Sequence, residues 1–303
     1  MPKKNVRFDY FKVWSDYFNE TTNMMEQSLT DLTEAIKAAQ SIDVSRRILV
    51  VGDDVARLQN IKFNNNKWEL HFMRIRKQGF PVRTKDDGTV NFFDDMEDDE
   101  GLGEEVSALY DPQTHVIMIR RNMFSLSPSA IANFFTTIVG GPGFSIYFKP
   151  LVHPRAMELI QNDHLIRGAT VYVSDVKNAK SRTKFSLGRL TNKTEDINES
   201  VNYSIKISLN QKGSKKNSNI PIYEELQELE EDANVESIEV RTKANEDAKV
   251  EYVDLVKHRL TDFNVFTDRD FDNNFRNIVH ETVIAKMQQL YRTRVDEIKN
   301  TYV

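Results

Sequence analysis

Residues Asp94–Asn122 read DDMEDDEGLGEEVSALYDPQTHVIMIRRN, and this stretch indicates the type of fold. It begins with an acidic block, in which eight of the twelve residues from Asp94 to Glu105 are Asp or Glu. Two strand-like runs follow, and Asp111-Pro112-Gln113-Thr114 between them carries a turn signal. Short apolar runs on both sides of a turn predict a β-hairpin over Val106–Arg121.

The residues before this hairpin predict more antiparallel strands. The Asn64-Asn65-Asn66 run predicts a tight turn between two of them, because Asn tolerates positive φ. Apolar residues at helical spacing between Met24 and Ile36 predict a helix over residues 22–40. The expected strands are Val6–Val13, Arg47–Val51, Arg57–Phe63 and Lys67–Arg76.

The residues after the hairpin predict both helices and strands. Ser127 followed by Pro128 is typical of a helix start, and Gly140–Gly143 is typical of a helix end. A long amphipathic helix is expected over Asp270–Lys299. The other expected elements are strands at Phe144–Leu151, Leu165–Val173, Val201–Leu209, Val235–Val240 and Lys249–Val253, and helices at Pro154–Gln161 and Ile222–Glu231.

This order of elements predicts an α+β protein with two domains. Residues 1–162 are expected to form a curved antiparallel sheet with helices, and residues 163–303 a smaller α+β domain that ends in the long helix. Thirty residues is long for a helix within one domain, so packing against a second subunit, and hence a homodimer, is expected.

Composition limits the class of protein. The 303 residues are 39% hydrophobic and include no cysteine, which excludes disulfides and thiolate metal sites. There is no run of about 18 apolar residues and no secretory signal in the first residues, so a cytoplasmic protein without membrane insertion is expected.

Charge is segregated along the second half of the chain, although the net charge is only −5. Arg167–Lys216 holds 11 Lys/Arg against 4 Asp/Glu, whereas Tyr223–Glu251 holds 3 against 11. One interpretation is a pair of solvated faces that attract each other. The other is an anion-binding face beside an acidic, partner-facing one.

The sequence carries no recognisable catalytic motif. The six histidines lack metal-ligand spacing, and Gly140–Gly143 lacks the Lys-Ser/Thr of a phosphate-binding loop. No cofactor or resident metal site is therefore expected, and an enzyme is the less favoured class. The acidic block leaves one catalytic alternative, a Mg²⁺-dependent nuclease, because neighbouring carboxylates can hold Mg²⁺.

Nucleic acid is the favoured ligand, because basic side chains gather in a few segments and phosphate contacts need such donors close together. A solvated basic loop that balances the acidic segment is the competing interpretation. The candidate phosphate contacts are Arg74, Arg76, Arg120, Arg121, Lys177, Lys180, Arg182, Lys184, Arg189 and Lys193. In an alternative hypothesis, the protein is a sensor or adaptor that binds a phage or host protein through Asp94, Asp95, Glu97, Asp98, Asp99 and Glu100.

Several segments carry a family resemblance. The residues Gly103–Pro112, His115–Asn122 and Ser125–Ser129, with Trp68–Arg76 upstream, resemble an uncharacterised bacterial family with an E-x-S-A-L-Y-D-P…R-R-N signature. The layout is also similar to the phage lambda exclusion protein RexA, through Lys149–Val152, Arg167–Thr170 and the last helix. A more distant similarity is to the Kiwa defence component KwaB.

The RexA resemblance implies a dimeric two-domain protein of bacterial or prophage origin. Such a protein would bind DNA with little sequence preference in phage exclusion or abortive infection, and a membrane-protein effector would be a further partner. No residue of RexA is carried over by a motif, so the site residues rest on charge alone.

Overall fold

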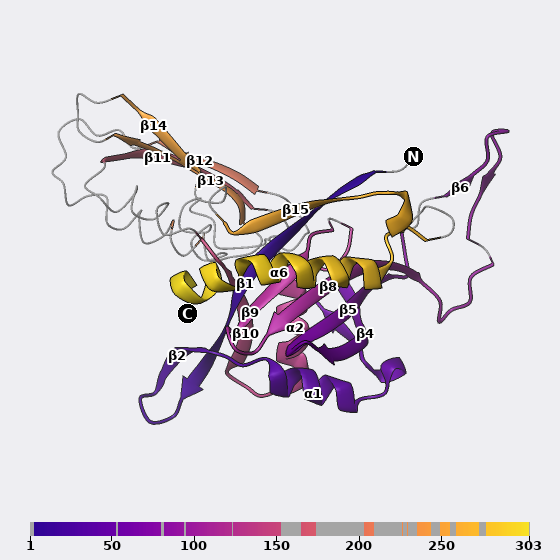
Figure 1. Ribbon diagram of the computed structural model, residues 1–303, viewed down its shortest axis with the longest axis horizontal. Helices are drawn as coiled ribbons and strands as arrows, with labels where there is room; N and C mark the ends of the chain where they lie inside the picture. The colour runs from indigo at the N-terminus through magenta and orange to yellow at the C-terminus, as the bar shows by residue number, and fades with distance from the viewer. Residues whose placement is uncertain are drawn as a thin grey trace.

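The computed structural model describes residues 3–52, 54–79, 82–93, 95–122, 124–152, 165–173, 203–208, 226, 229, 235–243, 249–254, 259–272 and 277–302. These residues form an α+β fold, as the sequence predicts. A large, curved antiparallel sheet carries helices on both faces, and a smaller sheet lies at one end (Figure 1).

The large sheet has nine strands. Their order is β10-β1-β9-β8-β5-β4-β3, and β15 and β2 also pair with β1. The strands are β1 Lys4–Asn19, β2 Met24–Leu29, β3 Ile48–Val51, β4 Asp54–Asn64, β5 Lys67–Arg76, β8 Leu102–Asp111, β9 Val116–Arg120, β10 Phe144–Pro150 and β15 Thr261–Phe266.

The smaller sheet has four antiparallel strands in the order β12-β11-β13-β14. They are β11 Leu165–Val173, β12 Tyr203–Ser208, β13 Val235–Lys243 and β14 Glu251–Asp254. A separate two-stranded hairpin, β6 Arg83–Thr84 with β7 Val90–Asn91, projects from the other end of the molecule (Figure 1).

Strand β1 organises the large sheet because four other strands pair with it. Its first half pairs with β15, with Lys4 opposite Phe266, and its second half pairs with β10 on the same side. The opposite side of β1 pairs first with β9 and then with β2. A hydrogen bond of 2.6 Å from the Leu260 amide to the Leu151 carbonyl joins β10 and β15 where they meet.

The two predicted hairpin turns are confirmed. Asn65 and Asn66 have φ values of 51° and 59° between β4 and β5, the left-handed conformation that tight hairpin turns require. The β8–β9 turn ends at His115, which also has a positive φ of 52°. Strand β9 therefore starts one residue later than the sequence predicts.

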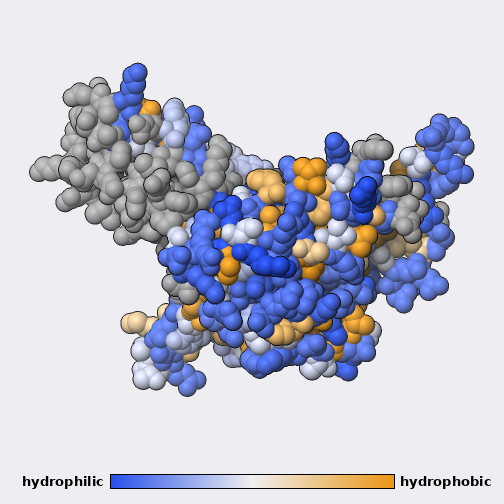
Figure 2. Space-filling model, in the orientation of Figure 1, coloured by the Kyte–Doolittle hydropathy of each residue, from blue (hydrophilic) through white to orange (hydrophobic). Residues whose placement is uncertain are grey.

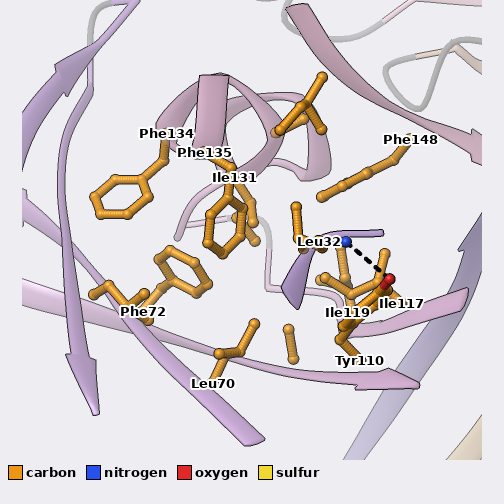
Figure 3. Close-up of a cluster of buried hydrophobic side chains, with 14 of the residues drawn as sticks. Leu32, Leu70, Phe72, Tyr110, Ile117, Ile119, Ile131, Phe134, Phe135 and Phe148 are labelled. Carbon is orange, nitrogen blue, oxygen red and sulfur yellow. Dashed lines mark hydrogen bonds between the residues drawn. The ribbon is translucent and has the colours of Figure 1, made fainter. Parts of the chain in front are cut away.

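The first hydrophobic core lies between one face of the large sheet and the helices α1 Thr33–Ser41 and α2 Pro128–Val139 (Figure 3). Alternate residues of β5, such as Phe72, point into this core. The Tyr110 hydroxyl fixes the start of α1, since it accepts a hydrogen bond from the Leu32 amide (2.9 Å) and donates one to Oδ1 of Asp31 (2.9 Å).

Helix α2 begins and ends where the sequence predicts. The Ser127 hydroxyl accepts a hydrogen bond from the Ala130 amide at 3.1 Å, and Pro128 occupies the first helical position. Gly140, with φ of 68°, ends the helix.

The second core lies on the opposite face of the sheet, beneath α6 His280–Tyr302 (Figure 1). Val283, Met287, Tyr291 and Ile298 of α6 are buried against β1, β8 and β9. The helix begins ten residues later than expected, because Asp268–Asp270 forms a separate short 3-10 helix.

One prediction about these elements is wrong, and one strand was not predicted. The helix expected over residues 22–40 is the strand β2 followed by α1, and the exposed Met24 and Met25 lie on β2. Strand β15, which the sequence analysis missed, pairs with β1, so β15 and α6 belong with the first sheet although they lie beyond residue 162.

The apolar stripe of the last helix has a partner within the same chain. Because α6 buries this stripe on its own sheet, the stripe is not the dimer contact that the sequence analysis expected. The helix expected at 154–161 lies outside the described residues, as does most of the one expected at 222–231. In the described part of the chain, no helix is long and apolar enough to cross a bilayer.

Candidate functional site

A row of five residues crosses the large sheet on the face that α6 covers. The strand register places Phe8 beside Arg120, Ser107 beside His71, and His71 beside Asn60. Continuing the β8–β9 register by one pair places Ser107 beside Arg120. We call these residues the central row. Four of its five members are polar, and all five except Asn60 are buried or partly buried.

The first residue of α6 sits on this row. The His280 ring stacks on the His71 ring, with 3.9 Å between centroids and an interplanar angle of 10°. Nδ1 of His280 shares a hydrogen bond of 2.8 Å with the Ser107 hydroxyl. Nε2 of His71 lies 3.5 Å from Oε1 of Glu105. These contacts fix where α6 starts.

Burial controls the electrostatics of this cluster. Burial, with a smaller contribution from the neighbouring His71, lowers the pKa of His280 to about 4. The His71 ring lowers the pKa of Glu105, which therefore stays ionised at neutral pH. At the start of α6, His280 is thus a neutral imidazole near the carboxylates of Glu105 and Glu281.

Arg120 has more buried polar atoms without a hydrogen-bond partner than any other residue of the central row. Only 5% of its surface is exposed, and Nε and Nη1 have no hydrogen-bond partner. Burial lowers the pKa of Arg120, while the charge of Glu105 opposes this shift. A buried guanidinium without hydrogen bonds is costly, so Glu105 is its main electrostatic compensation.

A groove opens beside the central row, between the β4–β5 hairpin and the outer side of α6. It has a volume of about 380 Å³. Glu69, Ile284 and Gln288 form its buried floor, and the exposed Lys62 and Arg292 lie at its rim. His280 also lines it, so the groove and the central row share one residue. We call it the α6 groove.

Hydrogen bonds hold the floor of the α6 groove. Oε1 of Glu69 accepts hydrogen bonds from Nδ2 of Asn64 (3.0 Å) and from Nε2 of Gln288 (3.2 Å). Strand alternation places Glu69 on this face, while its neighbours Trp68 and Leu70 point into the first core. A preorganised carboxylate therefore faces the groove.

The structure separates the described cations of the predicted nucleic-acid site. Nε of Arg74 lies 2.7 Å from Oδ1 of Asp54, and Nε of Arg121 lies 3.4 Å from Oδ2 of Asp9. Arg76 is partly exposed, at the end of β5. Arg120 is buried, so the expectation that it contacts phosphate at the surface is wrong, because a guanidinium beneath α6 cannot reach a polynucleotide.

Six of the predicted cations lie outside the described residues. They are Lys177, Lys180, Arg182, Lys184, Arg189 and Lys193. The described residues alone therefore do not assemble an exposed basic surface.

The acidic block lies on the projecting hairpin segment. We call residues 82–101 the acidic arm; Asp94 lies outside the described residues. Asp95, Glu97, Asp98, Asp99 and Glu100 are all exposed. Figure 2 shows mainly hydrophilic side chains on this arm, at the right of the view.

The arm also exposes apolar side chains. Phe92 is 64% exposed and Val90 is 53% exposed. Both line a shallow hollow of about 350 Å³ together with Arg83 and Asp95. Arg83 lies over the Phe93 ring and forms an ion pair of 3.0 Å with Asp95. The arm thus combines an acidic strip with an exposed aromatic ring.

Among the described residues, no group of three or more His, Asp or Glu side chains is arranged to hold a metal ion. The carboxylates of the acidic arm are spread along it, so this part of the structure offers no support for the Mg²⁺-dependent nuclease.

The groove and the central row were not predicted from the sequence. Lys67–Arg76 was predicted as a strand, but only its apolar face entered that prediction. The opposite face carries Glu69 and His71 at the same period of two, and this pattern was the available signal. The contribution of His280 and Gln288 depends on where α6 docks, which no local pattern indicates.

Comparison with protein-family models gives a match over nearly the whole chain. A family model described as a family of unknown function (DUF6731) matches residues 1–299. No curated protein matches the chain.

Proposed function

The chain belongs to the DUF6731 family over residues 1–299, and on the evidence of its own surface we propose that it is a non-enzymatic adaptor. Its acidic arm would dock onto the positively charged face of another protein. The observation that carries this proposal is the exposure of Phe92 beside the acidic strip.

Two properties of the arm support a protein partner. An exposed aromatic ring next to a hollow is typical of an interface anchor, because aromatic side chains supply much of the binding energy of interfaces. The strip from Asp95 to Glu100 would select a basic partner and speed its association. A DNA-binding protein of a phage or of the host presents such a basic face.

Arm variants test this proposal. Phe92→Ala should weaken binding to the partner by about 2 kcal/mol or more, or roughly thirtyfold. Neutralising Asp95, Glu97 and Asp98 to their amides should slow association and reduce its salt dependence. The partner would be isolated with the full chain as bait and then purified, and its binding measured by surface plasmon resonance.

The matched control is Phe263→Ala on β15, where an aromatic ring is 60% exposed outside the arm. It should leave binding unchanged. If Phe92→Ala binds the partner as tightly as the unaltered protein does, the arm is not part of the interface. A partner without a basic surface would also contradict the proposal.

A second proposal retains DNA as the ligand, in phage exclusion or abortive infection. It is supported by the excess of 11 Lys/Arg over 4 Asp/Glu in residues 167–216. Because phosphate contacts release counterions, affinity for DNA should fall steeply with salt.

Charge reversal separates the two proposals. Replacing Lys180, Lys184 and Arg182 by Glu should weaken DNA binding and flatten its salt dependence, since each lost phosphate contact reduces the salt slope by about 1. Electrophoretic shift assays at several salt concentrations give both quantities. If the unaltered protein gives no shift at physiological salt, the second proposal fails and the adaptor proposal does not.

A further inference from the structure

We infer that the α6 groove binds a nucleoside phosphate whose base carries an exocyclic amino group. The base would lie on the floor at Glu69, and the phosphate would lie at the rim between Lys62 and Arg292. This ligand site is separate from the acidic arm, so it does not depend on the proposed function.

The size and lining of the groove suit a small polar ligand. Its volume of about 380 Å³ falls within the range of roughly 300–1,000 Å³ that is usual for small-molecule sites. The buried Ile284 supplies apolar floor, and the partly buried His280 supplies an aromatic ring. Nucleobases stack on such rings, which favours a planar ligand.

The rim supplies positive charge for an anion. Among the described residues, neither Lys62 nor Arg292 forms an ion pair. Lys62 lies directly opposite Glu69 in the β4–β5 register, yet no ion pair joins the two side chains. The exposed Glu281 also lines the groove, but the two cations outnumber this one rim carboxylate. The rim therefore attracts an anionic group, and arginine can bind a phosphate with two parallel hydrogen bonds.

The floor supplies an acceptor for an amino group. Asn64 and Gln288 already donate to Oε1 of Glu69, so Oε2 is the oxygen that remains for a ligand. Carboxylates accept from the exocyclic amino groups of bases, and Asn and Gln amides pair with base edges. Uracil would fit less well, because carbonyl oxygens flank its N3–H and would face the carboxylate.

The experiment measures binding of single compounds to the full chain by isothermal titration calorimetry and thermal shift. AMP, CMP, GMP, UMP and inorganic phosphate are compared, along with a short single-stranded DNA that carries a 5′-phosphate. The three amino-bearing nucleotides should bind about tenfold more tightly than UMP and phosphate. Tighter binding of the strand than of AMP would identify a strand end as the source of the nucleotide.

Three variants locate the site. Glu69→Gln keeps the size of the side chain and should abolish the preference for AMP over UMP. Lys62→Glu combined with Arg292→Glu should weaken AMP binding at least about tenfold, or about 1.4 kcal/mol. Lys299→Glu, which changes an exposed lysine of α6 outside the groove, is the matched control and should bind AMP normally.

Circular dichroism and the melting temperature without ligand show that each variant folds. The inference is overturned if no nucleotide binds, if phosphate alone binds as tightly as AMP, or if Lys299→Glu loses as much affinity as the double reversal. Arm variants such as Phe92→Ala should bind AMP normally, so failure of the adaptor proposal would leave this result unchanged.

Discussion

Replacing Phe72 with alanine should lower the free energy of unfolding by about 3–5 kcal/mol. Phe72 is fully buried, and its ring meets the rings of Phe134 and Phe135 edge-on, with centroids 5.4 and 5.8 Å away (Figure 3). The substitution removes both contacts and leaves a cavity between β5 and α2. A loss of this size can exceed a third of the stability of a typical domain.

Urea unfolding followed by tryptophan fluorescence measures this loss, since Trp14 and Trp68 both lie in the large sheet. Phe263→Ala removes an equal volume from an exposed position and should change stability by about 0.5 kcal/mol or less. If the two variants unfold at the same urea concentration, the packing described between β5 and α2 is wrong.

Acidification should destabilise the protein between about pH 6.5 and pH 4 through His280. Burial lowers the pKa of His280 from 6.5 to about 4 in the folded state, so the unfolded chain binds more protons in this range. Stability therefore falls as the pH falls, by up to about 3 kcal/mol. The depressed pKa of Glu105 adds a loss of the same sign at lower pH.

Two variants separate titration of His280 from its hydrogen bond. His280→Gln cannot be protonated, so most of the loss between pH 6.5 and pH 4 should disappear. Ser107→Ala removes the 2.8 Å hydrogen bond but keeps the imidazole, so stability should fall at every pH while the pH dependence persists. Urea midpoints measured at half-unit pH steps give the slopes. An unchanged slope in His280→Gln would exclude His280 as the titrating group.

Local patterns predicted much of the large sheet. The strand Lys67–Arg76, the turn at Asn65 and the start of α2 at Ser127 all follow from residue types within a few positions of each other. Alternation, positive φ and side-chain capping act locally, so one sequence is enough to indicate them.

Long-range pairing could not be predicted in this way. Residues 24–29 have helical spacing, but pairing with β1 makes them a strand. Thr261–Phe266 pairs with β1, and nothing near it in sequence indicates that partner. Tertiary pairing overrode the helical spacing of residues 24–29 and set the partner of Thr261–Phe266.

The candidate sites, too, could be predicted only where their signal is local in the sequence. The exposed acidic strip from Asp95 to Glu100 was visible from composition. The burial of Arg120 was not, because a strand-end arginine has the same local pattern whether or not a helix later covers it. The α6 groove combines residues 60–69 with residues 280–292, which are far apart in sequence, so it has no local signature.

The pairing of Lys4 with Phe266 has a consequence for synthesis on the ribosome. Strand β1 has to wait for one of its neighbours until Thr261–Phe266 has also left the exit tunnel. During that delay part of its edge is open to wrong pairing, for instance with nascent chains on adjacent ribosomes. Truncation before residue 261 should therefore yield aggregates rather than a smaller folded product.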